Sequence, residues 1–293
     1  MASLKDIRSR IDSTKNTQQI TRAMKMTSAA KLRRAQHNIV NMRPYAHSLL
    51  ALIADIAVTH RVDHALLSIP QEPKKVLLIV VTSDRGLCGA FNTNINKFAE
   101  RFMNENRATF DKMDCIFIGK KAAEYFRRRN VAAVDTILNL ARDVSYELAS
   151  GVAAKAMEDF RSGHYDEVRV IYNEFKSAIA QNVVCETILP IDIAHAATLN
   201  KGTGGFPADM IYEPDPALII EDLIVKHFNV QMYRCMSESV AAEHGARMSA
   251  MENATKNAGE MINSLTLTYN KLRQASITTE LIEITSGAEA LKG

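Results

Sequence analysis

Small and apolar side chains recur three, four and seven residues apart through residues 216–287. No proline follows Pro216, and before Gly287 glycine occurs there only at Gly245 and Gly259. Such a repeat predicts one continuous helix of roughly 100 Å with a coiled-coil seam along one side. The expected seam positions are Val240, Met251, Ala254, Ala258, Met261, Leu265, Leu272, Ala275 and Ile282. A stripe of this length needs a second long helix to cover it.

Residues 3–59 are expected to form that second helix. Ser3 and Asp6 have the spacing of a capping box, and Pro44 is expected to bend the helix because it removes one backbone hydrogen bond. The heptad positions are Ile7, Ile11, Thr14, Gln18, Thr21, Leu32, Ala35, Ile39, Met42, Ala46, Leu49, Ile53 and Ile56. Polar or small residues at 18–28 predict tight pairing there with little hydrophobic contribution.

Between these helices the pattern changes to alternating strands and helices. Residues 76–82 form a continuous β-branched and apolar run, as expected of a strand buried on both faces. Further strands are expected at 114–118, 131–137, 167–173 and 182–190, the last two forming a hairpin. One helix is expected to run to about 106 with Asn92 or Thr93 as its N-cap, and two more are expected at 120–129 and 146–161. This order predicts a three-layer α/β domain, Rossmann-like, with a mainly parallel sheet.

The expected fold class is therefore α/β, with the central domain inserted into a long antiparallel coiled coil. The parts are an N-terminal coiled-coil helix at 1–60, a central α/β domain at 74–198, a glycine- and proline-rich foot loop at 199–215, and a C-terminal coiled-coil helix at 216–293. Asp215 and Pro216 suit the N-cap and first position of that last helix.

Charge is unevenly distributed, although the net charge is only +3. Residues 1–43 are rich in Lys and Arg, and Asp6 and Asp12 are their only acidic side chains. This run fits a solvated helix face, or a surface for an acidic protein, nucleic acid or anionic lipid. The four cysteines are widely separated, which favours neither a zinc site nor a disulfide framework.

Catalytic and cofactor motifs are not recognisable in the chain. The loop 83–89 follows the first strand, where doubly wound folds bind ligands, but it matches neither GxGxxG nor GxxxxGK[ST]. It is more typical of a tight turn whose tip contacts another protein. We therefore expect no catalytic residue, no cofactor and no metal. Near the C-terminal end, a dense polar cluster at 271–280 fits either a solvated helix flank or a recognition site.

Five segments resemble the γ subunits of F-type ATP synthases, in the same order along the whole chain. They are LKDIRSR at 4–10, NTQQITRAMKM at 16–26, TSDRGLCG at 82–89, YEPDP at 212–216 and YNKLRQASITTEL at 269–281. The resemblance implies a non-catalytic rotary shaft whose coiled coil turns inside a ring of three α and three β subunits. It also implies contacts with the ε subunit and the membrane c-ring, and catalysis at the αβ interfaces.

Residue roles follow from the resemblance by position. Arg273, Gln274, Thr278 and Glu280 correspond to contacts that catch a β-subunit loop. The stretch passing the acidic lever of β corresponds to Met24, Lys25, Arg247, Arg85 and Cys88. Met210 and Tyr212 lie where the family's foot meets the ring. The resemblance implies a peripheral location on the cytoplasmic face of the bacterial inner membrane, with membrane association only through the Fo sector and no nucleic-acid partner.

The cysteines and the N-terminal Met bear on which type of the family this chain resembles. The chloroplast type carries an inserted pair of redox cysteines, which this sequence lacks, so thiol gating is not expected. The chain starts with Met just before the family's first helix, which favours a bacterial origin.

Without the resemblance, two other functions would compete. One is a coiled-coil nucleic-acid binder, which would show salt-sensitive binding. The other is an α/β enzyme with a helical dimerisation arm, which would show nucleotide binding.

Overall fold

The structure is a computed structural model that describes residues 3–59, 64–70, 72–138, 144–177, 180–192, 212–213 and 215–290. Its elements, in chain order, are α1 (Leu4–Thr59), η1 (Ala65–Leu67), β1 (Lys75–Val81), α2 (Phe91–Glu105), β2 (Lys112–Ile118), α3 (Lys120–Arg127), β3 (Ala133–Ile137), α4 (Tyr146–Arg161), β4 (Glu167–Phe175), β5 (Gln181–Leu189) and α6 (Pro216–Ala290). The predicted strand and helix order is confirmed.

The chain divides into two compact units. One, the coiled-coil unit, comprises Met1–Ser28 and Met248–Gly293, and the other, the α/β unit, comprises Ala29–Arg247. Helices α1 and α6 each contribute residues to both units. Most of the predicted foot loop, at 199–211 and 214, lies outside the described residues, so the foot and the predicted part boundaries stay predictions.

A five-stranded sheet with the order β3-β2-β1-β4-β5 forms the centre of the α/β unit. Strands β1, β2, β3 and β4 are parallel to one another, whereas the edge strand β5 runs antiparallel to β4. The mainly parallel sheet and the β4–β5 hairpin are therefore as predicted.

Alternating side chains of β1 build two separate cores, one on each face of the sheet. Val76, Leu78 and Val80 pack in the core that contains side chains of α2 and α3. Leu77, Ile79 and Val81 pack in the core that contains side chains of α1, α4 and α6. All six side chains are fully buried, so β1 is the central strand of a three-layer unit.

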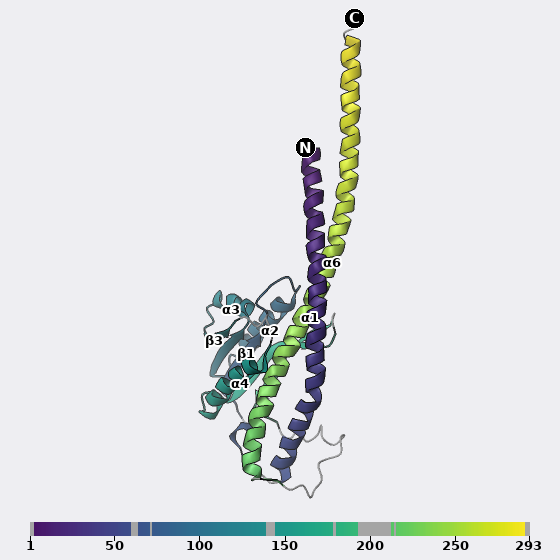
Figure 1. Ribbon diagram of the computed structural model, residues 1–293. Coiled ribbons are helices and arrows are strands. Elements are labelled where there is room, and N and C mark those ends of the chain that lie inside the picture. The colour runs from purple at the N-terminus through teal and green to yellow at the C-terminus, as the bar shows by residue number, and fades with distance from the viewer. Residues whose placement is uncertain are drawn as a thin grey trace. The chain divides into compact units, whose positions relative to one another are not determined.

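In the coiled-coil unit, α1 and α6 run antiparallel (Figure 1). Lys25 contacts Glu252, Thr21 contacts Thr255 and Gln18 contacts the backbone of Thr255, so residue numbers rise on one helix as they fall on the other. On α1, Ile7, Ile11 and Thr21 are buried at heptad positions as predicted. The predicted capping box also forms, because Ser3 N donates to Asp6 and Asp6 N donates to the Ser3 hydroxyl.

The seam predicted for α6 is correct only in part. Met251 and Ala258 are buried, but Met261 is 56% exposed and Ile282 is 59% exposed. Beyond 258 the less exposed positions are Ile262, Leu265, Tyr269, Leu272 and Ser276, which keep a seven-residue repeat. The prediction included Leu265 and Leu272 of this repeat but missed Ile262 and Tyr269.

Candidate partner-binding surfaces

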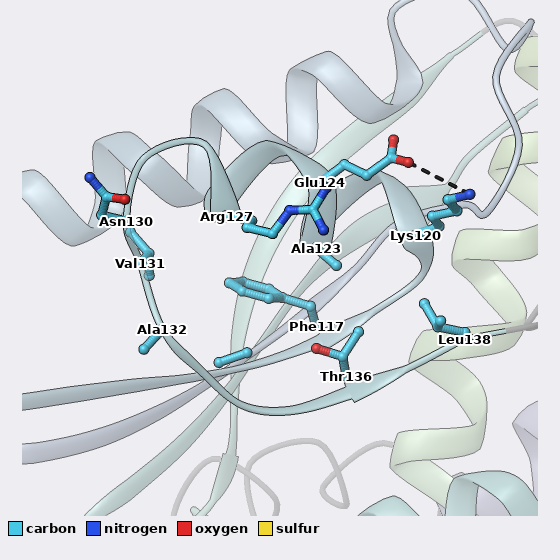
Figure 2. Close-up of a pocket in the computed structure, with 11 residues that line it drawn as sticks. Phe117, Lys120, Ala123, Glu124, Arg127, Asn130, Val131, Ala132, Thr136 and Leu138 are labelled. Carbon is cyan, nitrogen blue, oxygen red and sulfur yellow. Dashed lines mark ion pairs between the residues drawn. The ribbon is translucent and has the colours of Figure 1, made fainter.

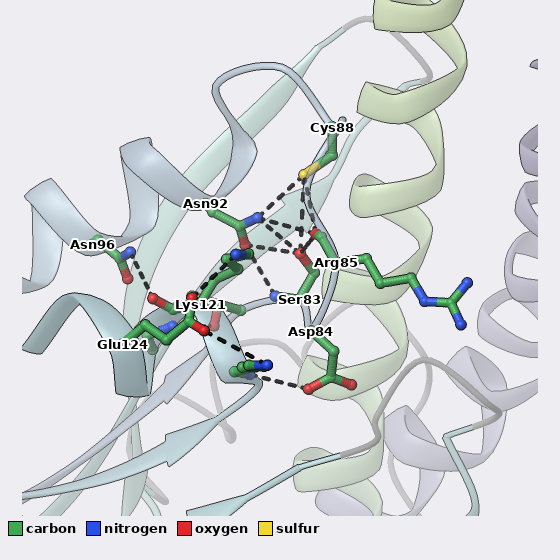
Figure 3. Close-up of polar contacts among 11 residues, drawn as sticks. Ser83, Asp84, Arg85, Cys88, Asn92, Asn96, Lys121 and Glu124 are labelled. Atoms are coloured by element: carbon green, nitrogen blue, oxygen red, sulfur yellow. Dashed lines mark hydrogen bonds and ion pairs between the residues drawn. The ribbon is translucent and has the colours of Figure 1, made fainter. Parts of the chain in front are cut away.

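The loop after β1 is held by a local hydrogen-bond network (Figure 3). Ser83 N donates to the Asn92 side chain at 3.0 Å, and the Ser83 hydroxyl donates to the Arg85 carbonyl at 2.6 Å. Asn92 Nδ2 in turn donates to the Ser83 hydroxyl at 2.8 Å. The prediction that Asn92 or Thr93 caps α2 is wrong, because the N-cap is Ala90 and Asn92 bonds to the loop instead.

Consecutive side chains of this loop point in opposite directions, into the unit and out to solvent. Leu87 has a left-handed backbone with φ of 64° and is 63% exposed, whereas Cys88 is buried. Burial raises the pKa of the Cys88 thiol, and the nearby charge of Arg247 offsets this only in part. The Cys88 thiol packs inside the unit, and its contact with the β subunit stays a prediction. Arg85 remains exposed, whereas the exposure of Leu87 was not predicted and has no sequence signal beyond its place between Gly86 and Gly89.

The carboxyl ends of β1 and β2 approach each other closely beneath this loop. Gly119 has φ of 98°, and a Cβ at this position would lie 2.3 Å from the carbonyl oxygen of Thr82. The Thr82 hydroxyl accepts a hydrogen bond from Ala122 N at 2.9 Å, and Asp84 accepts one from Lys120 N at 3.0 Å. Backbone and side chains therefore fill the space between the two strand ends.

Helix α6 covers the edge of the sheet where a doubly wound domain would bind a ligand. Arg247 donates to the carbonyl of Gly86 at 3.2 Å and to Glu243 at 2.6 Å, and Ser239 donates to the carbonyl of Val81 at 3.5 Å. The side chains of Glu243 and Arg247 are almost completely buried. Because the chain's own helix occupies this edge, the arrangement does not favour the nucleotide-enzyme alternative.

Arg247 is also engaged within the α/β unit, and its contact with the β subunit stays a prediction. Its guanidinium is occupied by Glu243 and by the loop carbonyl, and the residue is only 8% exposed. Arg247 therefore holds the loop that carries Arg85 and Leu87 rather than presenting its own charge at the surface. Sequence spacing could not reveal this, because Arg247 and Gly86 are 161 residues apart.

In the coiled-coil unit, polar contacts join the two helices where the sequence predicts weak hydrophobic pairing. Thr255 donates to the Thr21 hydroxyl at 2.8 Å, and Gln18 reaches the Thr255 carbonyl at 3.4 Å. Lys25 forms an ion pair with Glu252 at 2.6 Å and remains 38% exposed. Met24 is half-buried beside it in sequence. Both predicted contact residues are thus partly accessible on α1.

The C-terminal end of α6 extends past the N-terminus of α1 and is exposed on nearly every side (Figure 1). Arg273, Gln274, Thr278 and Glu280 are all exposed, and Thr278 donates to the Gln274 carbonyl one turn earlier at 2.9 Å. Large apolar side chains lie exposed in the same stretch, namely Leu267, Ile277, Leu281, Ile282 and Ile284. A helix end with this many exposed apolar side chains is typical of a surface that another protein covers.

Of the predicted foot residues, Tyr212 is described and Met210 lies outside the described residues. The Tyr212 hydroxyl donates to Asp55 of α1 at 3.2 Å. Partial burial and the Asp55 carboxylate raise the pKa of Tyr212, so the hydroxyl stays protonated. Its polar end is therefore engaged within the α/β unit, and contact with a ring stays a prediction.

A groove of about 840 Å³ lies between α3 and the edge strand β3 (Figure 2). Phe117 and Val131 contribute apolar surface, while Lys120 and Glu124 form an ion pair at 3.7 Å on its rim.

Among the described residues, no group of three or more His, Cys, Asp or Glu side chains is placed to hold a metal ion. The same part of the chain contains no helix that is long and apolar enough to span a membrane.

Comparison with known proteins identifies the family. Residues 3–291 match a family model described as ATP synthase. The ATP synthase gamma chain of Bdellovibrio bacteriovorus is 64% identical over 295 residues, and that of a Geobacter species is 48% identical over 293 residues, with both comparisons covering 100% of each chain.

Solved structures agree with this assignment. A chain of the central stalk and c-ring of Tetrahymena thermophila mitochondrial ATP synthase has a TM-score of 0.62 and 26% identity, covering 80% of this chain and 99% of that one. A chain of the Euglena gracilis mitochondrial enzyme has a TM-score of 0.67 at 24% identity, covering 98% of this chain and 94% of that one, and so shares the fold. The chain therefore belongs to the γ-chain family of ATP synthases.

Proposed function

We propose that this chain is the central-stalk rotor of a bacterial F-type ATP synthase and is not itself catalytic. In this proposal, its coiled coil turns inside a ring of three α and three β subunits, where the nucleotide sites lie. The α/β unit and the foot dock on the ε subunit and the c-ring. As a part of this complex, the chain would lie peripherally at the cytoplasmic face of the inner membrane. It would associate with the membrane only through the Fo sector.

The observation that carries this proposal is the exposed end of α6. It combines an apolar surface, including Leu267 and Ile284, with the polar cluster Arg273, Gln274 and Thr278. A surrounding ring of subunits covers the apolar side chains while the polar ones give directional contacts with individual β subunits. Glu280 also belongs to this cluster, and Met24, Lys25 and Arg85 are proposed as further β contacts.

Coupling between rotation and nucleotide affinity follows from linkage. The shaft has no three-fold symmetry, so each β subunit meets a different face of it. A face that binds the open form of β more tightly than the closed form lowers the nucleotide affinity of that β subunit. Turning the shaft therefore changes the three sites in sequence, and nucleotide turnover turns the shaft by the same linkage.

The proposal is tested by reconstituting α and β subunits of the same organism with this chain and measuring ATP hydrolysis. We expect the full chain to assemble an active complex, and a chain ending before Lys271 to assemble less or turn over more slowly. Lys256→Ala is the matched control, because Lys256 is exposed on α6 outside the polar cluster. Unchanged activity after truncation would show that the polar cluster is only a solvated flank. Failure of the full chain to assemble would reject the proposed function.

A further inference from the structure

Within the α/β unit, an ion pair connects α6 to the β4–β5 hairpin. Arg234 Nη2 of α6 donates to Glu186 Oε1 of β5 at 2.6 Å. Tyr172 of β4 donates its hydroxyl to the other Glu186 oxygen at 2.8 Å and accepts from Arg234 Nη1 at 3.0 Å. Each of the three side chains thus contacts the other two, and we call this set the helix clamp.

Further contacts fix the orientation of the Arg234 guanidinium. Its Nε donates to Gln231 at 2.6 Å, and its Nη1 lies 3.5 Å from Glu238 one turn further along α6. The Arg234 side chain is 17% exposed and that of Glu238 is 4% exposed. A planar guanidinium with partners on several donors tolerates little rotation, so the clamp defines a direction as well as a distance.

Tyr172 and the nearby His227 are both uncharged near neutral pH. Burial raises the pKa of Tyr172 far above its usual value, so its hydroxyl remains a proton donor. The neighbouring His227 is neutral, because burial, together with the positive charge of Arg234, lowers its pKa to about 4. The Tyr172 hydroxyl therefore remains available to donate to Glu186 near neutral pH.

Apolar packing around the same part of α6 does not define direction in this way. Phe228, Met232 and Met236 are fully buried in the core beneath the sheet. Hydrophobic burial is non-directional, and methionine side chains adapt to small displacements of their neighbours. A slight rotation of α6 about its axis would leave this burial almost unchanged, but it would separate Arg234 from Glu186.

We propose that the helix clamp sets the rotational position of α6 relative to the sheet. It also makes the contact between α6 and the β4–β5 hairpin resistant to twisting. Torque applied to the α/β unit then reaches α6 with little elastic twist. Arg234, Glu186 and Tyr172 are positioning residues in this role, since none belongs to the surfaces proposed to contact α or β. The inference rests on the proposed rotor function.

The test measures how far the α/β unit fluctuates about a shaft held in the ring. Complexes of α, β and this chain are immobilised, and a bead is attached through Lys97→Cys, at an exposed position of α2. The angular variance of the bead is recorded during pauses at low ATP concentration. Because Arg234→Met removes every directional contact of the guanidinium, we expect the variance to rise about twofold or more, with Arg234→Lys intermediate.

A matched control separates the clamp from ion pairs in general. Lys155→Met breaks the 2.8 Å pair with Asp135 at the opposite end of the sheet and should leave the variance unchanged. Glu186→Gln provides a second clamp variant that keeps the side-chain shape at a position where the Glu186 side chain is 40% exposed.

The outcomes are distinguishable. Wild-type variance in a rotating Arg234→Met complex overturns the inference, even if its melting temperature falls, because the role would then be only structural. If Arg234→Met does not assemble, unchanged variance in Glu186→Gln overturns the inference in the same way. Absence of ATP-driven rotation in the wild type would instead reject the proposed function.

Discussion

Arg247 and Glu243 form an ion pair of 2.6 Å although their side chains are only 10% and 5% exposed. Both residues lie on α6, one turn apart, where the helix covers the carboxyl end of the sheet. Burial raises the pKa of Glu243, and the charge of Arg247 opposes this rise. Each charged group therefore depends on the other to remain in the interior.

We predict that Arg247→Met lowers the free energy of unfolding by about 3 kcal/mol or more, because it leaves Glu243 buried without its partner and the Gly86 carbonyl without its donor. The double variant Arg247→Met/Glu243→Met should lose less than the single variant. Urea denaturation of the full chain measures both. A double variant that is less stable than Arg247→Met alone would contradict the pairing argument.

We predict that Gly119→Ala is severely destabilising, by about 3 kcal/mol or more, because a Cβ would meet the Thr82 carbonyl and the backbone has a positive φ. The matched control is Gly151→Ala in α4, where nothing lies within 4 Å of the added methyl group. Alanine at position 151 should raise the free energy of unfolding by about 0.5–1 kcal/mol, because alanine has a higher helix propensity than glycine. Equal melting temperatures for the two variants would show that the close approach at Gly119 is not as described.

Two buried histidines predict acid sensitivity. Burial lowers the pKa of His227 and of His244 to about 4, with Arg234 acting in the same direction on the first and Arg247 and Lys31 on the second. Glu186 opposes the shift of His227. The folded state therefore binds fewer protons than the unfolded state between about pH 6.5 and pH 4.

The contribution of the two histidines to stability should accordingly be constant above about pH 7, and stability should fall on acidification through this window by roughly 1 kcal/mol for each histidine at pH 5.5. Thermal unfolding at pH 7.5 and pH 5.5 tests the effect, with His227→Gln as the comparison. The variant should lose part of the pH dependence. A pH dependence identical to that of the wild type would show that His227 titrates normally.

The thiols are predicted to react slowly in the folded chain. Burial raises the pKa of Cys88, raises those of Cys115 and Cys235 to about 12, and raises that of Cys185 to about 11. Only Cys185 is not fully buried. A chromogenic disulfide reagent at pH 7.5 should therefore modify at most one thiol before denaturant is added, and none in Cys185→Ser. Rapid reaction of Cys88 in the Cys185→Ser variant would contradict its burial.

Local patterns predicted the elements well where local chemistry determines them. Helix α4 has its expected bounds because Ser145 caps its first turn and Gly163, with φ of 72°, follows its end. The β-branched run of β1 lies at the centre of the sheet because both of its faces are apolar. The order of these elements was sufficient to predict a three-layer unit.

Long-range contacts account for the errors. Asn92 has the chemistry of a helix cap, yet its side chain bonds to Ser83. The burial of Arg247 and Cys88 was not predicted, because it depends on the return of α6 to the loop. The helix clamp was also not recognised, because Tyr172, Glu186 and Arg234 carry no local motif and meet only through folding.

Direct observation of rotation is the measurement that tests the rotor proposal most directly. A ring of α and β subunits is fixed to a surface with this chain assembled in it, and a bead on Lys97→Cys is followed after ATP is added. The proposed function predicts continuous rotation in one direction that stops when ATP is removed. A complex that hydrolyses ATP while the bead remains stationary, or fluctuates without net direction, would contradict it.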